Sequence, residues 1–374
     1  SFTTPPPPGS NATFTWLMAA DVGQAQVDGS SVTMGIKPGA MGNFRGMARA
    51  AAAARPGLVS YSGDISYSDG AIGDWELFLE NAAPVLGVAP VLVQQGNHER
   101  DAYINSTLNS GDWIRGANYG FECGVPVEEL FLMPTATHTK PWYSLDYGPV
   151  HILALSSELD MAPGSAQWDF AAADLAGVDR ARTPFVVMQW HRLMYSAGPA
   201  GSSDYQWGDQ VRGRGPYMYQ NGWDDLIYNA SVDLTITGHF HVYSRTCPVH
   251  QRTCIPGTRP DGRLGGPIHV TTGWGGPQSF GNLAAPPWPY IAATNNASSP
   301  NGFLRVAVSR TQLAVEALAV GCSRRRRCMC EACQPGCGVG LVPVPKASCQ
   351  HATTVAPLCL IRKCPSSTAD QLCR

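Results

Sequence analysis

Five groups of polar residues follow apolar runs in the sequence, and their residue types are those that bind metal ions. The groups are Asp21-Val-Gly23, Gly63-Asp64-Ile-Ser-Tyr67, Gly96-Asn97-His98-Glu99, a single His191, and Gly238-His239-Phe240-His241. A pair of metal ions ~3.5–4 Å apart needs about seven ligands, with one carboxylate shared between the two ions. Two aspartates, an asparagine, a tyrosine and three histidines supply that number. Oxygen and imidazole donors without a thiolate favour iron, manganese or zinc over copper.

The elements that must position these groups alternate along the chain. Periodicity predicts strands at 12–20, 57–62, 89–94, 142–147, 150–156, 185–189, 232–237, 269–272, 303–309 and 313–318, and helices at 42–54, 72–83, 165–176 and 223–229. Alternating strands and helices indicate an α/β fold with layered mixed sheets. Every polar group directly follows an expected strand. Because sites in open α/β sheets form at the carboxyl ends of strands, we expect the five loops to converge on one crevice.

The order of the five groups resembles the signature of the purple acid phosphatases, a branch of the calcineurin-like metallophosphoesterases. The resemblance covers roughly residues 14–320. It includes stretches between the groups, such as 122–126 and 146–151, and Arg245-Thr-Cys-Pro248 after the last group. Gly-Asn-His alone recurs by chance, whereas five groups in order, each after an expected strand, are specific. The resemblance implies a layered metallophosphoesterase sandwich of two mixed β-sheets flanked by helices.

The resemblance also implies a role for each polar residue. It assigns a ferric ion to Asp21, Tyr67 and His241, a divalent ion (iron, zinc or manganese) to Asn97, His191 and His239, and the bridge between the ions to Asp64. His98 would lie outside the ligand set and act on the substrate, by stabilising phosphoryl oxygens or protonating the leaving group. Two cations neutralise phosphate charge and lower the pKa of water, so that hydroxide can attack phosphorus at mildly acidic pH. A tyrosinate on Fe(III) would make the protein purple.

The region of the fourth group departs from the family pattern in two ways. That group is commonly Val-x-x-His, and this chain has Met188-Gln-Trp-His191, which exchanges one apolar residue for another. Many plant members carry further histidines soon afterwards to contact phosphate, and residues 192–206 contain none. Arg192 follows His191 directly. It could supply the missing positive charge as a catalytic residue, or it could be an ordinary surface arginine.

Composition and charge divide the chain near residue 320. The 374 residues are 44% hydrophobic and 14% charged, which suits a sizeable core. No apolar run approaches the ~18 residues that a membrane span needs, and a net charge of −2 gives no basis for binding a nucleic acid polymer. Residues 321–374 hold eight basic and two acidic residues, against 18 and 26 before them. We expect a Pro-rich leader (1–12), a metallophosphoesterase domain (13–320) and a basic, disulfide-rich C-terminal segment (321–374).

Cysteine is equally uneven, with nine of the twelve residues at 322–373. An even count packed into a short segment suits an oxidising compartment. Cys247 and Cys254 flank a short proline-containing loop and could close it. Nine cysteines cannot all pair among themselves, so within one chain Cys123 should take the ninth; an intermolecular bridge is the alternative. The segment Cys328-Met-Cys330-Glu-Ala-Cys333 could also be read as a zinc site.

Several weak signs predict a secreted glycoprotein. Sequons for N-glycosylation occur at Asn11, Asn105, Asn229 and Asn296. The sequence also begins at Ser1 rather than Met, as a chain does after removal of a signal peptide. Together with the cysteines, these features favour an extracellular location.

Two classes of function fit these observations. The first is a secreted acid phosphatase for phosphate monoesters, with phosphodiesters and nucleotide pyrophosphates as further candidate substrates. The second is an extracellular structural or filament-forming glycoprotein built on a phosphatase scaffold. An acidic body and a basic tail could attract head to tail, and a heterologous contact that does not close makes filaments, through the leader (with Pro5–Pro8) or the tail. The run Arg324–Arg327 could contact acidic polysaccharide or remain solvated.

Overall fold

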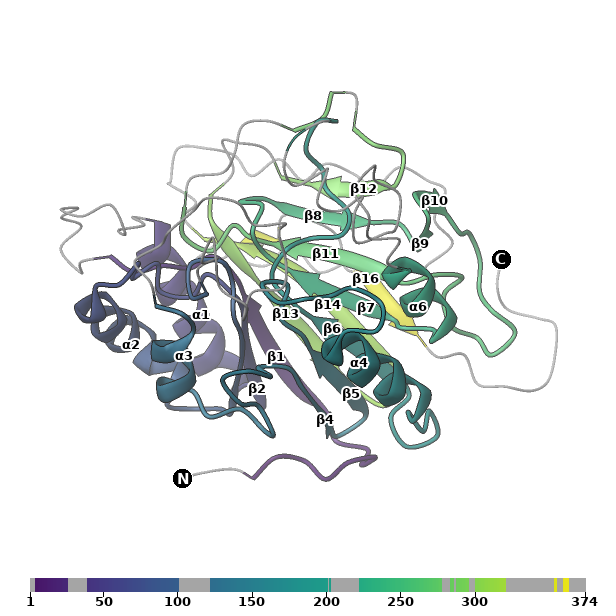
Figure 1. The fold of residues 1–374 in the computed structure, drawn as a ribbon, viewed down its shortest axis with the longest axis horizontal. Coiled ribbons are helices and arrows are strands. Elements are labelled where there is room, and N and C mark those ends of the chain that lie inside the picture. Colours follow the sequence, from purple (N-terminus) through teal and green to yellow (C-terminus); the bar gives the residue numbers. More distant parts are fainter. Residues whose placement is uncertain are drawn as a thin grey trace.

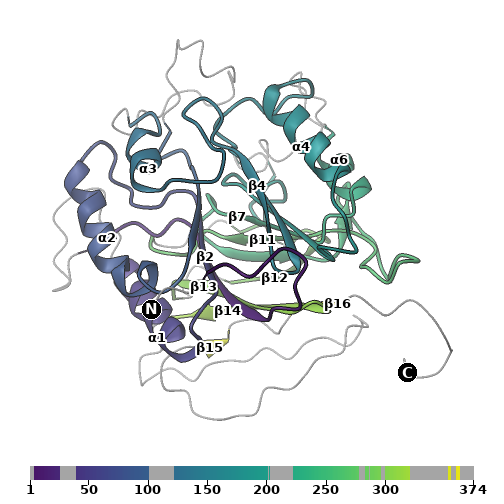
Figure 2. The ribbon, with the colours of Figure 1, turned by 90° about the horizontal axis from the view of Figure 1, so that it is seen from below.

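A computed structural model describes residues 4–25, 39–100, 122–200, 202, 222–277, 283–285, 287–295 and 300–320, with the backbone alone at 353–354 and 359–362. Within these residues two mixed β-sheets pack against each other, and helices cover both outer faces (Figures 1 and 2). The arrangement confirms the layered sandwich that the resemblance implied.

The first sheet has the order β15-β14-β13-β1-β2-β3, with β16 also paired to β14. In the same order its strands are Thr353–Thr354, Gln312–Ala319, Gly302–Val308, Phe14–Ala19, Leu58–Ser62 and Val91–Gln94, and β16 is Cys359–Arg362. β1, β2 and β3 run parallel, whereas the other pairs are antiparallel. Backbone from the cysteine-rich segment therefore extends this sheet, as the yellow strand beside β14 shows in Figure 1.

The second sheet has the order β12-β8-β11-β7-β6-β5-β4. In that order its strands are Ile291–Thr294, Tyr243–Thr246, Ile268–Thr272, Leu234–Thr237, Phe185–Gln189, Val150–Ala154 and Tyr143–Tyr147. The central strands β5, β6, β7 and β11 run parallel. A two-stranded hairpin of β9 (Val249–His250) and β10 (Thr253–Cys254) lies apart from both sheets.

The helices divide between the two outer faces. α1 (Gly39–Ala54), α2 (Ile72–Leu86) and α3 (Val125–Leu130) cover the first sheet, and α4 (Ala166–Ala176) and α6 (Trp223–Asn229) cover the second (Figure 2). Among the described residues, none of the helices has the length and apolar character to cross a membrane.

Each central strand is buried on both sides, and β1 shows how. Its residues Trp16 and Met18 point into the core between the sheets, whereas Leu17 and Ala19 point towards α1. All four are fully buried. Because such strands have two apolar faces, they read in sequence as continuous apolar runs that end abruptly at a polar loop.

The leader contacts its own chain at the turn between β4 and β5. Gly9 N donates to Gly148 O at 2.7 Å, and Arg310 Nη1 donates to Gly9 O at 2.9 Å. The leader is thus tied to the turn between β4 and β5 in the second sheet and to the turn between β13 and β14 in the first. Self-association through the leader stays a prediction.

Candidate metal centre

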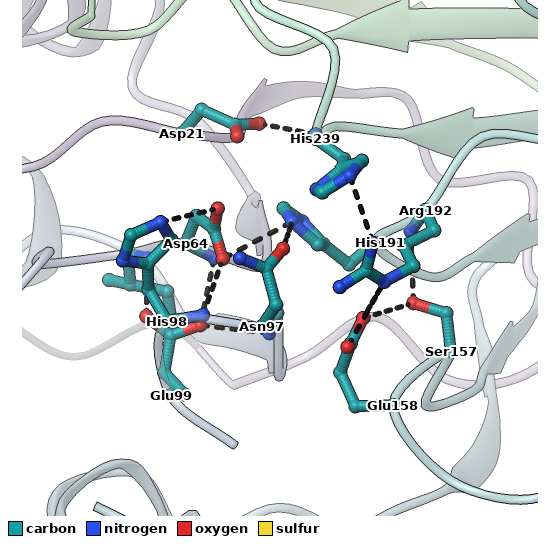
Figure 3. Close-up of polar contacts among 12 residues, drawn as sticks. Asp21, Asp64, Asn97, His98, Glu99, Ser157, Glu158, His191, Arg192 and His239 are labelled. Atoms are coloured by element: carbon teal, nitrogen blue, oxygen red, sulfur yellow. Dashed lines mark hydrogen bonds and ion pairs between the residues drawn. The ribbon is translucent and has the colours of Figure 1, made fainter. Parts of the chain in front are cut away.

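Every expected ligand lies just beyond the carboxyl end of a strand. Asp21 follows β1, Asp64 and Tyr67 follow β2, Asn97 follows β3, His191 follows β6, and His239 and His241 follow β7. The first three strands belong to the first sheet and the last two to the second. The loops of both sheets therefore meet, and their polar side chains point toward one another in Figure 3.

Three of the seven expected ligands form one contact group. Tyr67 Oη donates to Asp21 Oδ1 at 3.1 Å and lies 2.9 Å from His241 Nε2, and that nitrogen is 3.4 Å from Asp21 Oδ1. Burial, followed by the negative charges of Asp21 and Asp64, raises the pKa of Tyr67 well above its ordinary value. The phenol therefore stays protonated unless a strongly acidic cation draws off its proton.

The remaining four expected ligands form the second contact group. His191 Nε2 lies 3.2 Å from Asp64 Oδ1 and 3.1 Å from Asn97 Oδ1. One donor atom each from Asp64, His191 and His239 lie within 4.8 Å of one another, a spacing that could hold a metal ion. His191 Nδ1 is 2.9 Å from Ser62 O, a carbonyl that can only accept, so Nδ1 carries the proton and Nε2 faces the site.

The buried carboxylates of the site favour a positive charge beside them. Burial alone would lower the pKa of His191, but the carboxylates of Asp64 and Asp21 raise it to about 10. Burial would likewise raise the pKa of Asp64, yet the neighbouring His191 and His98 hold it well below its usual range. Buried carboxylates of this kind can be neutralised by a proton on His191 or by a metal cation. The donor set therefore fits a cation site.

Four of the seven expected ligands sit in the left-handed backbone region, with φ values of 54° for Asp21, 49° for Asp64, 52° for Tyr67 and 68° for His239. Such conformations cost of order 1–3 kcal/mol for residues other than glycine, and they gather at functional sites. Tyr67 is the clearest case, because a bulky side chain is rare there. The loops thus hold an unfavourable backbone that aims the side chains inward.

Two glycines allow the loops to approach the carboxylates. A Cβ atom on Gly96 would lie 2.2 Å from Asp64 Oδ1, and one on Gly238 would lie 2.3 Å from Asp21 Oδ2. Both distances are too short for any side chain. These positions therefore require glycine for the aspartates to keep their places.

His98 lies beside the candidate ligands with its ring held by Asp69. His98 Nδ1 is 2.7 Å from Asp69 Oδ1, and His98 Nε2 is 3.8 Å from Asp64 Oδ2. Burial would lower the pKa of His98, but Asp64 and Asp69 raise it above its ordinary value. The ring is thus suited to be an imidazolium. Asp69 was not predicted, although it lies in the same loop as Asp64 and Tyr67.

Arg192 is not a surface arginine, because only 14% of its side chain is exposed. Its Nε donates to both oxygens of Glu158, each at 3.1 Å, and its Nη1 lies 3.0 Å from His239 Nε2 (Figure 3). Glu158 was also not predicted. The signal that could have found it is position, because it follows the carboxyl end of β5 as the other site residues follow their strands.

The remaining predicted residues are the cysteines and the glycosylation sites. Cys247 and Cys254 form the expected disulfide, which joins β10 to the residue that follows β8. Cys123 is exposed, and its expected partners in the tail lie outside the described residues. Asn11 and Asn229 are exposed, as glycosylation requires. Asn105, Asn296 and the cysteines of 321–374 lie outside the residues that the structure describes.

Two mixed sheets with helices on both faces, and nitrogen and oxygen donors gathered at the strand ends, define the class of metallophosphoesterase scaffolds. The model of the calcineurin-like phosphoesterase family matches residues 17–243, and the chain belongs to this family. Within it, purple acid phosphatases are the chain's homologues.

Three relatives show how far the similarity extends. The chain is 32% identical over 277 residues to "Probable inactive purple acid phosphatase 1" of Arabidopsis thaliana, covering 74% of this chain and 43% of that protein. It is 30% identical over 291 residues to a nucleotide pyrophosphatase/phosphodiesterase of Hordeum vulgare, covering 77% and 76%. Purple acid phosphatase PPD1 from yellow lupin has a TM-score of 0.70 and 28% identity, covering 84% of this chain and 52% of that one. The chain thus spans about half the length of the Arabidopsis and lupin proteins.

Proposed function

We propose that this chain hydrolyses phosphate monoesters with the help of two metal ions, one ferric and one divalent (iron, zinc or manganese). One observation carries the proposal: seven suitable donors, between position 21 and position 241, gather at one place. A single buried aspartate or histidine after a strand has ordinary explanations, such as a cap or a core hydrogen bond. Seven donors at five strand ends do not share such an explanation.

The residues fall into the two sets that such a pair of ions needs. The ferric ion would be held by Asp21, Tyr67 and His241, the divalent ion by Asn97, His191 and His239, and Asp64 would lie between them. When bound, the two cations would neutralise phosphate charge and lower the pKa of a water molecule towards mildly acidic pH. Tyr67 supports the ferric assignment, because its raised pKa keeps it neutral until a strongly acidic cation is present.

His98 would act on the substrate rather than on the metals. Asp69 holds its Nδ1, which fixes the ring, and Nε2 lies 3.8 Å from Asp64 Oδ2, on the side of the expected metal ligands. Because the pKa of His98 is raised by Asp64 and Asp69, against the effect of burial, the ring can donate at mildly acidic pH. A donor there would stabilise phosphoryl oxygens or protonate the leaving oxygen.

The test is hydrolysis of a chromogenic phosphate monoester by the metal-loaded chain. Asp21→Ala and Asp64→Ala should abolish turnover while unfolding remains cooperative, and Asp169→Ala, on the exposed face of α4, should retain it. Turnover retained by Asp64→Ala would rule out this site. A chromogenic diester and a nucleotide pyrophosphate belong in the same assay, because the barley relative is named for those activities.

A second candidate function is an extracellular scaffold without catalysis. The names of several relatives contain "probable inactive", which favours keeping this candidate. It predicts ordered self-association through the leader or the basic tail. Light scattering at high concentration tests it: monodisperse monomers, unchanged by deletion of 321–374, would contradict it. A secreted origin, also proposed here, predicts glycans on Asn11 and Asn229, which peptide mass spectrometry can detect.

A further inference from the structure

The guanidinium of Arg192 is held from one side by a buried acidic residue. Glu158 has a fully buried side chain, and both of its oxygens accept from Arg192 Nε at 3.1 Å. Ser157 Oγ donates to Glu158 Oε1 and accepts from Arg192 N, both at 2.9 Å. These contacts fix the arginine at its Nε end, as Figure 3 shows.

The two terminal nitrogens of Arg192 remain outside that contact. Nη1 lies 3.0 Å from His239 Nε2, and among the described residues no acceptor contacts Nη2. Arginine presents a rigid, planar fork of donors, which matches the oxygens of a phosphate group. The guanidinium end of this side chain is therefore suited to bind a phosphoryl group beside the candidate metal ligands.

The bond between Arg192 and His239 cannot coexist with a metal ion on His239. Arginine can only donate, so His239 Nε2 accepts and Nδ1 carries the proton. A metal ion needs a lone pair of the same ring. If it takes Nε2, the acceptor of Arg192 is lost. If it takes Nδ1, the proton moves to Nε2, which then no longer accepts. Either way, Arg192 Nη1 loses its partner.

We propose that Glu158 and Ser157 position Arg192 as a phosphate-binding arm, which becomes available to the substrate when His239 binds its metal ion. The inference rests on the proposed function for the metal role of His239. It adds Glu158 as a positioning residue and gives the substrate's phosphoryl group a second contact besides His98. The arm would take the place of the histidines that many plant members carry after this strand.

Inorganic phosphate, titrated calorimetrically into the metal-loaded full chain, tests the arm without any turnover. Arg192→Gln should weaken phosphate binding by about 10- to 100-fold, the usual range for one charged hydrogen-bond donor. Arg305→Gln is the matched control, because Arg305 pairs with Glu316 on the β13–β14 hairpin and should bind phosphate as the wild type does. Equal affinities in wild type and Arg192→Gln would overturn the proposal.

The affinity for metal should change in the opposite direction. Because metal binding breaks the hydrogen bond between Arg192 and His239, Arg192→Gln should bind Zn²⁺ at the divalent site about 3- to 10-fold more tightly. A purely structural arginine would lower both affinities or neither. Unchanged or weaker Zn²⁺ binding in this variant would contradict the link between the arm and the metal.

The positioning role of Glu158 is tested by combining its substitution with that of Arg192. Glu158→Gln should weaken phosphate binding by about 3- to 10-fold, because the arginine stays charged but loses one of the two oxygens that hold its Nε. The double variant Arg192→Gln/Glu158→Gln should match Arg192→Gln alone, and it also avoids a buried glutamate without a cation. Fully additive losses would show that Glu158 acts independently of Arg192, against the positioning role.

The inference and the proposed function can fail separately. Metal-dependent phosphate binding that needs Arg192, in a chain that hydrolyses no ester, would support the arm and contradict the phosphatase. Ester hydrolysis by a protein whose phosphate affinity is unaffected by Arg192→Gln would support the phosphatase and contradict the role of Arg192 in binding phosphate.

Discussion

The buried carboxylate of Glu99 accepts a hydrogen bond from the backbone N–H of Asp64, with 2.8 Å between Oε2 and N. The same oxygen accepts from Gly96 N at 2.8 Å, and Oε1 accepts from Ile65 N at 2.6 Å. One side chain thus ties the loop after β2 to the loop after β3. Because Asp64 and Asn97 are on those loops, Glu99 sets the spacing between two expected metal ligands.

Glu99→Gln should therefore weaken metal binding without contacting the metal. The amide replaces one acceptor by a donor that faces a backbone N–H, so the two loops separate. We expect a loss of about 10- to 100-fold in metal affinity, the range typical of residues that orient ligands. Metal content after dialysis against graded chelator measures it. Glu129→Gln, at an exposed position of α3, is the control; equal metal retention in both variants would contradict the role of Glu99.

Tyr67→Phe should remove the visible absorption of the iron-loaded protein. A ferric–tyrosinate band needs the phenolate, and in the metal-free protein the raised pKa of Tyr67 keeps the phenol protonated. Tyr61→Phe is the matched control, because Tyr61 is buried and its hydroxyl has no partner among the described residues. It should keep the colour and unfold no more easily than the wild type. A purple Tyr67→Phe protein would assign the band to another ligand.

Gly96→Ala should disrupt the site more than the fold. The added methyl group would lie 2.2 Å from Asp64 Oδ1 and 2.5 Å from Asp64 N, so the aspartate must move. We expect a cost of about 1–3 kcal/mol in the free energy of unfolding, together with loss of ester hydrolysis. Gly73→Ala in α2 meets nothing within 4 Å and should be neutral or stabilising by up to about 1 kcal/mol. Denaturant titration and turnover measure both; an active Gly96→Ala protein would show that Asp64 tolerates displacement.

The strands that carry the site could be predicted because both of their faces are buried. β6 (Phe185–Gln189) and α6 (Trp223–Asn229) have the predicted bounds. Prediction missed α3, a single short turn that begins Val125-Pro126. It also missed β12, whose residues alternate between partly buried and exposed, because pairing with β8 forms that strand rather than an apolar pattern. The helix at 72–83 continues to Leu86 through Pro84, since Val85 is still buried.

The types of the site residues could be predicted from the sequence, whereas the contacts and backbone conformations that hold them in place could not. Nothing in the sequence indicates the left-handed backbone conformation of Tyr67, because most tyrosines avoid that conformation. Likewise, Glu158 reads as an ordinary charged residue until its contact with Arg192 is seen, more than thirty positions away. Local patterns place polar residues at strand ends, but only the packing of the two sheets decides which of them meet.

A buried histidine outside the candidate metal centre ties α4 to the hairpin of β4 and β5. His151 Nδ1 lies 2.8 Å from Asp146 Oδ1, and His151 Nε2 lies 2.7 Å from Asp174 Oδ2. Two other groups face these carboxylates: Ser144 Oγ donates to Asp174, and Arg182 Nε lies 3.3 Å from Asp146 Oδ2. Burial would lower the pKa of His151, but the bonds to Asp174 and Asp146 raise it above 6.5.

This raised pKa makes stability depend on pH in a defined direction. The folded protein holds the proton on His151 more tightly than the unfolded chain, so the stabilisation is fully present below pH ~6.5 and is lost as pH rises through the folded-state pKa. His151→Gln should lower the free energy of unfolding at pH 6 by about 2–3 kcal/mol, and less at pH 9, where more of the wild-type protein has lost the proton that makes this interaction. His138→Gln is the control, because His138 is 46% exposed and its pairing with Glu128 should contribute within about 0.5 kcal/mol. Denaturant titrations at both pH values measure the differences; an equal loss at pH 6 and pH 9 would show that His151 stabilises the fold by packing rather than by charge.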